Sequence, residues 1–125
     1  MLLGEKNAIA TIAVRNIEAA KRFYEGILEL KLVHAEGPKA LSYKSGDAEV
    51  LVYESQFAGT NRATAVTWVV DQLEKIVQTL KAKGVQFEHY DMPGVTRQGD
   101  VHVAGSIKNA WFKDPDGNIL AMVSH

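Results

Sequence analysis

The chain contains no cysteine, no excess of either charge and no long apolar run, and each absence excludes a class of protein. Without cysteine there is no disulfide, no thiolate metal site and no thiol nucleophile. Lysine and arginine number 14 against 15 aspartates and glutamates, a formal net charge of −1, so the clustered positive charge that nucleic acids and anionic membranes attract is missing. No apolar run approaches the roughly 18 residues of a membrane-spanning helix, and residues 1–6 do not resemble a signal peptide. We therefore expect a cytoplasmic protein with neither a nucleic-acid nor a membrane partner.

What remains is the composition of an ordinary folded protein. The chain has 125 residues, of which 46% are apolar and 23% charged, as in average soluble domains. This length is enough for one domain, or for two small modules that share a core.

Two stretches of the sequence each predict a strand followed by a helix. Residues 8–14 are short, alternating and rich in β-branched side chains, and apolar residues then recur at helical spacing over 17–28. Asn16 is placed to cap this first helix. In the second stretch, residues 65–70 lead into a helical pattern at 73–80.

The second helix has its own boundary signals. Asp71 and Glu74 have the spacing of a capping box at its start, and Lys83-Gly84 is typical of a helix end. The two stretches also superimpose at a constant offset of 56 positions, as shown by the pairs Val14 and Val70, Ile17 and Leu73, and Ala20 and Ile76. The chain therefore looks duplicated.

Three strand-like segments follow each predicted helix. They are 31–35, 40–44 and 49–54 in the first half and 85–90, 109–113 and 119–123 in the second. Each half thus has the order βαβββ, which predicts module one at 6–54, a linker at 55–62 and module two at 63–125. In module two, residues 91–106 are expected to form a long inserted loop, and Asp114-Pro115-Asp116-Gly117 suits a type I turn.

These residues resemble a known family. The Phe23-Tyr24 pair in the first helix, the LKAKGVQFE segment at 80–88 and the WFKDPDGNILAMV segment at 111–123 are similar to those of the vicinal oxygen chelate superfamily. That superfamily includes glyoxalases, extradiol dioxygenases and bleomycin-resistance proteins. The resemblance implies an α+β fold in which two βαβββ modules form a half-open eight-stranded barrel, with helices outside and a ligand cavity inside.

The resemblance also implies where a metal ion would be held. Metal-dependent members place His, Glu or Gln side chains on four strands, at positions that correspond here to Ile9, Ala65, Ala121 and the segment 51–53. Alkyl side chains carry no lone pair, whereas a bound transition metal needs three or four N or O donors. We therefore expect no metal site, no cofactor and none of the family's metal-dependent chemistry.

The same correspondence predicts which side chains would contact a ligand. Strand alternation places Thr11 and Thr67 on the face of the corresponding metal positions. By resemblance, the residue before the Phe of the FxDPDGN segment faces the cavity, which makes Trp111 the first candidate contact, with Asn109 on the same face. Tyr53 and Tyr43 each offer an apolar ring and a hydroxyl at the rim or floor of the cavity. The pattern does not determine which way either side chain faces, and Tyr53 ranks above Tyr43.

The histidines and the arginine of the second half are weaker candidates. His102, placed in the 91–106 loop, could bind ligand or act as a general base, although an exposed loop histidine more often has no such role. A cluster of His89, Asp91, Asp100 and His102 could bind a metal outside the family's usual place only if the loop folded back. Arg97 could meet an anionic ligand, but solvation of the surface explains it as well.

Three functions remain open from the sequence. The leading hypothesis is a metal-independent protein that binds and sequesters a small molecule, as a homodimer or an intramolecular pair of modules. The alternative is a glyoxalase-type lyase, isomerase or dioxygenase with a non-standard or metal-free site, so whether the protein is an enzyme stays open. The third is an accessory module that binds no ligand.

Overall fold

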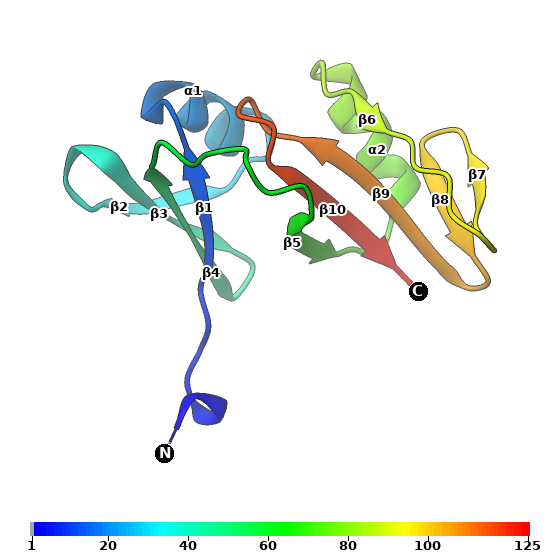
Figure 1. Cartoon of the computed structure of the whole chain (residues 1–125), viewed down its shortest axis with the longest axis horizontal. Helices are drawn as coiled ribbons and strands as arrows, with labels where there is room; N and C mark the ends of the chain where they lie inside the picture. The colour runs from blue at the N-terminus through cyan, green and yellow to red at the C-terminus, as the bar shows by residue number, and fades with distance from the viewer. Residues whose placement is uncertain (1) are drawn as a thin grey trace. The chain divides into compact units, whose positions relative to one another are not determined.

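The computed structural model describes residues 2–125 and divides the chain into two compact units, one ending at Ala58 and the other running from Gly59 to His125. Unit 1 contains a four-stranded sheet and unit 2 a six-stranded sheet, each with its own helix (Figure 1). The expected α+β class is confirmed, and neither sheet closes on itself within its unit.

Unit 1 has the predicted βαβββ order. Its elements are η1 (Leu3–Glu5), β1 (Ala10–Val14), α1 (Ile17–Lys21), η2 (Arg22–Ile27), β2 (Lys31–Ala35), η3 (Gly37–Lys39), β3 (Ala40–Ser45) and β4 (Ala48–Glu54). The strands lie in the order β1-β4-β3-β2, with β1 parallel to β4 and the other pairs antiparallel. In β1, Ile12 and Val14 are buried while Thr11 is exposed, as alternation predicts.

The first helix begins where the sequence predicts and then widens. The Asn16 carboxamide oxygen accepts a hydrogen bond from the Ala19 N–H at 2.9 Å, so the predicted N-cap is confirmed. From Arg22 the helix continues with π-helical geometry, a rare form. This segment buries both Phe23 and Tyr24, whose rings meet edge to face.

The π-helical segment is also bonded to the sheet. The Tyr43 hydroxyl donates a hydrogen bond of 2.8 Å to the Glu25 carboxylate. Burial raises the pKa of Tyr43 above its usual range, and the Glu25 charge acts in the same direction. Tyr43 is fully buried and bonded to the helical segment, which is consistent with its lower rank as a contact candidate.

Unit 2 repeats the order of unit 1 and adds a hairpin. Its elements are β5 (Thr64–Val69), α2 (Leu73–Ala82), β6 (Phe87–Glu88), β7 (Thr96–Gln98), β8 (Val101–Ala104), β9 (Ile107–Lys113) and β10 (Ile119–Ser124). The sheet order is β5-β10-β9-β8-β7, and β6 pairs with the far end of β9. In both units the first strand lies parallel to the last, as expected from a duplication.

Two predictions for unit 2 are wrong. Residues 91–106 are not a structureless loop, because β7 and β8 form an antiparallel hairpin there and β8 pairs with β9. Strand β8 pairs with the first residues of β9, and only Trp111 and Phe112 remain to pair with β6. The strand predicted at 85–90 is therefore shortened to Phe87–Glu88.

The capping box is the second error. Helix α2 has Gln72 as its N-cap, with no side-chain cap hydrogen bond. The Glu74 carboxylate instead accepts a 2.5 Å hydrogen bond from the Lys108 ammonium on β9, and this contact lowers the pKa of Glu74.

The turn between β9 and β10 is held by a buried carboxylate. Asp114 is 5% exposed, and its Oδ1 atom accepts hydrogen bonds from the Asp116 and Asn118 N–H groups at 3.0 and 2.9 Å. Its Oδ2 atom accepts from the Asn118 side-chain amide at 2.8 Å. Gly117, with φ of +89°, donates its N–H to the Asp114 carbonyl, which confirms the predicted turn and requires a residue that tolerates positive φ.

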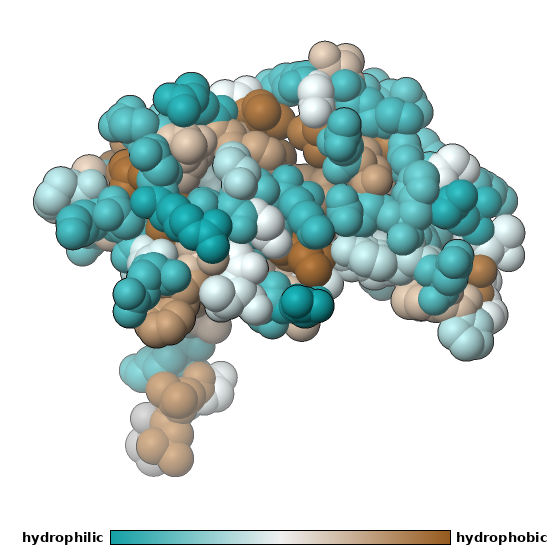
Figure 2. Space-filling view, turned by 45° about the horizontal axis from the view of Figure 1, so that its top comes forward, coloured by the Kyte–Doolittle hydropathy of each residue, from teal (hydrophilic) through white to brown (hydrophobic). Residues whose placement is uncertain are grey.

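The surface of the molecule is mainly hydrophilic on the face seen in Figure 2, with separate hydrophobic patches. One of these is the projecting N-terminal segment of unit 1, where Leu2 and Leu3 are each 84% exposed. Within residues 2–125 no helix combines the length and apolar character needed to cross a membrane.

Candidate functional site

Strand pairing in unit 2 places the predicted contact residues on one face of the sheet, opposite the face on which the apolar side of α2 packs. Directly paired residues point to the same side of a sheet. One row on this face runs across β5, β10, β9 and β6 and comprises Thr67, Ala121, Trp111 and Glu88. The next row comprises Val123, Asn109, His102 and Arg97 on β10, β9, β8 and β7. We call this surface the open face of unit 2.

The Trp111 side chain lies across β10. Its indole N–H donates a 3.1 Å hydrogen bond to the Thr64 hydroxyl on β5. Because β10 separates β9 from β5, the indole must pass over β10 to make this contact. Ala121, the direct partner of Trp111 on β10, is 2% exposed. Trp111 itself remains half-buried.

Two further rings, those of Tyr90 and His102, pack against the indole of Trp111. The Tyr90 ring meets the indole edge to face at 5.4 Å, and the His102 ring does so at 4.8 Å. Edge-to-face contacts of this kind are favourable and orient the rings. The indole is thus fixed by one hydrogen bond and two ring contacts.

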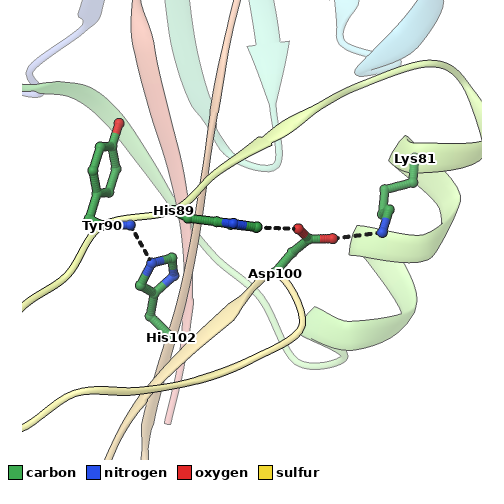
Figure 3. Close-up of polar contacts among 5 residues, drawn as sticks. All are labelled: Lys81, His89, Tyr90, Asp100 and His102. Atoms are coloured by element: carbon green, nitrogen blue, oxygen red, sulfur yellow. Dashed lines mark hydrogen bonds and ion pairs between the residues drawn. The ribbon is translucent and has the colours of Figure 1, made fainter.

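His102 is not in a mobile loop, as the sequence suggested, but on β8 and 2% exposed. Its Nε2 atom accepts a 2.9 Å hydrogen bond from the Tyr90 N–H (Figure 3). The ring must therefore be neutral at Nε2 and carry its proton on Nδ1. Nδ1 is buried and makes no hydrogen bond within residues 2–125, and the same is true of the Tyr90 hydroxyl.

Burial lowers the pKa of His102, and the positive charges of His89 and Arg97 act in the same direction. The backbone at Asn109 and Asp100 partly offsets this effect. His102 is therefore neutral at physiological pH. A group buried to this degree cannot contact a substrate unless Tyr90 and Trp111 move away.

A second polar array lies beside His102. Asp100, in the turn between β7 and β8, contacts the His89 ring through Oδ1 at 2.7 Å and the Lys81 ammonium of α2 through Oδ2 at 2.8 Å (Figure 3). The Lys81 and His89 hydrogen bonds lower the pKa of Asp100. The array therefore joins the hairpin to helix α2 and to the residue after β6.

This array does not form the alternative metal site that the sequence left open. His89, Asp100 and His102 come together as that hypothesis requires, but within the described chain no group of three or more His, Asp or Glu side chains is arranged to hold a metal ion. Asp91 is exposed.

The two contact residues predicted in unit 1 also share a face. Thr11 on β1 and Tyr53 on β4 point away from the buried side chains of the sheet, and Tyr53 is 38% exposed. The Thr11 hydroxyl bonds the Ile9 carbonyl. A surface pocket of about 590 Å³ lies near Ile9 and the β3–β4 turn, but neither Thr11 nor Tyr53 lines it.

The residues at the family's metal positions do not fit a metal ion. Ile9 is 49% exposed and precedes β1, Ala65 is on β5, and Leu51 and Tyr53 are on β4. Ala121 lacks a donor atom and is the direct strand partner of Trp111. No chemical step is therefore assigned to a metal in this protein.

Three residues that matter here were not found from the sequence: Thr64, Tyr90 and Lys81. Thr64 bonds a partner 47 positions away and Lys81 one that is 19 positions away, and neither lies in a recognisable motif. Tyr90 was assigned to a strand that in fact ends at Glu88.

Comparison with known proteins agrees with this fold. The family model described as "Glyoxalase/Bleomycin resistance protein/Dioxygenase superfamily" matches residues 7–122. No curated protein sequence matches the chain.

Several solved structures share the fold at low sequence identity. A glyoxalase family protein from Bacillus anthracis is 16% identical, with 97% of this chain and 95% of that chain covered and a TM-score of 0.74. The fosfomycin resistance protein FosX from Listeria monocytogenes is 12% identical, with coverage of 94% and 91% and a TM-score of 0.72. TnmS3, an antibiotic binding protein from Streptomyces sp. CB03234, is 19% identical, with coverage of 96% and 95% and a TM-score of 0.69.

Proposed function

Because the chain belongs to the glyoxalase/bleomycin resistance protein/dioxygenase superfamily, we propose that it binds a small organic molecule without a metal ion and acts by sequestration. The observation that carries this proposal is the presence of Ile9, Ala65 and Ala121 at the family's metal-ligand positions, together with the Trp111 indole that the Thr64 hydroxyl holds in place. Alkyl groups cannot coordinate a metal, whereas an ordered indole offers a flat apolar surface.

Trp111 is the main ligand contact in this proposal. Its side chain is already partly buried and held by the Thr64 hydrogen bond, so little side-chain entropy is lost when a ligand packs on the rest. Thr67 and Asn109 are polar neighbours in the same two rows of the open face. In unit 1, Thr11 and Tyr53 are the proposed ligand contacts on the face that they share in their own sheet, and the proposed working form is a homodimer.

Two similar structures support a binding role. TnmS3 is described as an antibiotic binding protein and FosX as a fosfomycin resistance protein. At 19% and 12% identity these likenesses extend to the fold, so the ligand class here rests on the chain's own residues. The alternative of a metal-free enzyme based on His102 is disfavoured, since that ring is 2% exposed.

The first experiment measures metal content by elemental analysis of untagged protein, with thermal melting in the presence of Zn, Ni, Mn and Fe. We expect no stoichiometric metal and no rise in melting temperature. A tightly bound equivalent of metal would overturn the proposal.

The second experiment screens small molecules through the fluorescence of Trp111 in a Trp68→Phe background, where Trp111 is the only tryptophan. Hits are then titrated calorimetrically. Trp68→Phe should keep the affinity of the parent protein, and Trp111→Leu should lower it at least tenfold. Equal affinity in both variants would show that Trp111 is not the contact.

A further inference from the structure

Residues 89 and 90 follow β6 but are not held by strand pairing. The β6 ladder stops at Glu88, and the chain then crosses to the hairpin. Two side chains of the hairpin segment replace the missing ladder. Asp100 contacts the His89 ring at 2.7 Å, and His102 accepts the Tyr90 N–H at 2.9 Å. We call these two hydrogen bonds the hairpin latch (Figure 3).

We propose that the hairpin latch positions Tyr90 against Trp111, and that protonation of His102 breaks the bond to the Tyr90 N–H and uncovers the part of the Trp111 indole against which the Tyr90 ring packs. The proposal goes beyond small-molecule binding, and it can be tested without a ligand. His102 and Asp100 are positioning residues here, because both act through the chain at 89–90.

Protonation of His102 breaks its bond to Tyr90 because the accepting atom is Nε2, a ring nitrogen that can itself take up a proton. Nε2 of His102 can accept the Tyr90 N–H only while it carries no proton. In the protonated ring, Nε2–H would face the Tyr90 N–H, so two donors would stand opposite each other. The Tyr90 amide would then lose its acceptor in a part-buried position, which is costly unless the segment moves to water.

The groups around His102 keep the latch closed at neutral pH. His89 faces it from the segment after β6, Arg97 from β7 and Trp111 from β9. The positive charge of Arg97 opposes a further positive charge on His102. The carboxylate of Asp100 would favour that charge, but it is engaged by Lys81 and His89.

Opening the latch has a direct consequence for Trp111. The Tyr90 ring packs edge to face with the indole, with ring centroids 5.4 Å apart. Release of the Tyr90 amide lets this ring move away, while His89 stays bonded to Asp100 and the indole to Thr64. Acid therefore frees one side of the indole and, for a ligand that packs against both rings, weakens binding.

The test follows the amide of Tyr90 by hydrogen exchange between pH 7.5 and 4.5, expressed as a protection factor so that intrinsic exchange is removed. Acrylamide quenching of Trp111 in the Trp68→Phe background is measured in parallel, and far-UV circular dichroism checks that the fold persists. We expect protection at Tyr90 to fall at least tenfold and quenching to rise, with a common midpoint below pH 6.5.

The variant that decides is His102→Gln. Its carbonyl oxygen can accept the Tyr90 N–H but does not titrate, so protection should stay high and independent of pH. The matched control is His34→Gln, an exposed histidine on β2 of unit 1, which should keep the transition of the parent protein. His102→Ala should lack protection at every pH.

Three results would overturn the proposal. One is a flat profile in the folded parent protein, and another is an unchanged transition in His102→Gln. The third is global unfolding in the same pH range that His102→Gln does not delay. In each case ligand binding at Trp111 could still be demonstrated by the screen described above, so the two failures are distinguishable.

Discussion

Removal of the Asp114 carboxylate tests whether the β9–β10 turn holds unit 2 together. Asp114→Ala deletes the acceptor of three hydrogen bonds, two from backbone N–H groups and one from the Asn118 amide. Each such bond contributes about 1 kcal/mol net. Because Asp114 and Asn118 are both less than 10% exposed, water replaces the lost acceptor poorly. We expect the free energy of unfolding to fall by about 3 kcal/mol.

This loss is large against the roughly 5–15 kcal/mol of a typical domain. With a urea dependence of about 2 kcal/mol per molar, the unfolding midpoint should fall by about 1.5 M. Both tryptophans, Trp68 and Trp111, lie in unit 2, so their fluorescence reports on this unit. Far-UV circular dichroism follows the whole chain.

Two further variants make the test specific. Asp114→Asn keeps an acceptor for the two backbone N–H groups but loses the one for the Asn118 amide, so it should cost about a third to a half as much. Asp47→Ala changes an exposed aspartate in the corresponding turn of unit 1 and should change stability by less than about 0.5 kcal/mol. A loss below 1 kcal/mol in Asp114→Ala, or an equal loss in Asp47→Ala, would refute the reasoning.

Three other predictions concern single contacts. Thr64→Val keeps the side-chain shape but removes the acceptor of the Trp111 N–H. In the Trp68→Phe background the emission anisotropy of Trp111 should therefore fall. Any ligand found in the screen should bind about three- to tenfold more weakly. Asn16→Ala removes the N-cap of α1 and should cost about 1 kcal/mol in thermal or urea unfolding. Asp100→Asn concerns a carboxyl whose pKa in the folded state is lowered by Lys81. The ionised carboxylate stabilises the folded state fully above the pKa that it has in the unfolded chain, and this stabilisation is lost as pH falls through its pKa in the folded state. The variant should therefore be less stable at pH 7, and its stability should depend less on pH in the acid range.

Local patterns in the sequence predicted most of the fold. The repeat was visible because two strand-helix stretches superimpose at an offset of 56 positions, and the structure pairs the first strand with the last in both units. The Asn16 cap and the Asp114 turn depend only on residues close by in the sequence, so the sequence predicts them as well. The hairpin was missed because β7 and β8 are only three and four residues long, too short for periodicity to distinguish them from a loop.

The candidate site was predicted less completely, because its contacts join distant positions. Alternation placed Trp111, Asn109 and Thr67 on one face, but no local pattern reports that Thr64 accepts the indole N–H from 47 positions away. The role of His102 was misjudged for the same reason. Its burial depends on Tyr90, twelve positions earlier, whose course after β6 follows from the hairpin.

The loss of a metal ligand and the gain of an aromatic surface are connected in unit 2. The indole of Trp111 reaches Thr64, the strand partner of Ile119, by crossing β10 on the face that carries Ala121. A glutamate at position 121 would occupy that space, and overpacking of this kind displaces neighbouring side chains. The small alanine removes the donor atom that a metal would need and, by the same change, leaves room for the indole. A site of this form recognises its ligand by shape and apolar contact rather than by coordination, so its specificity depends on how firmly Thr64, Tyr90 and His102 hold the ring in place.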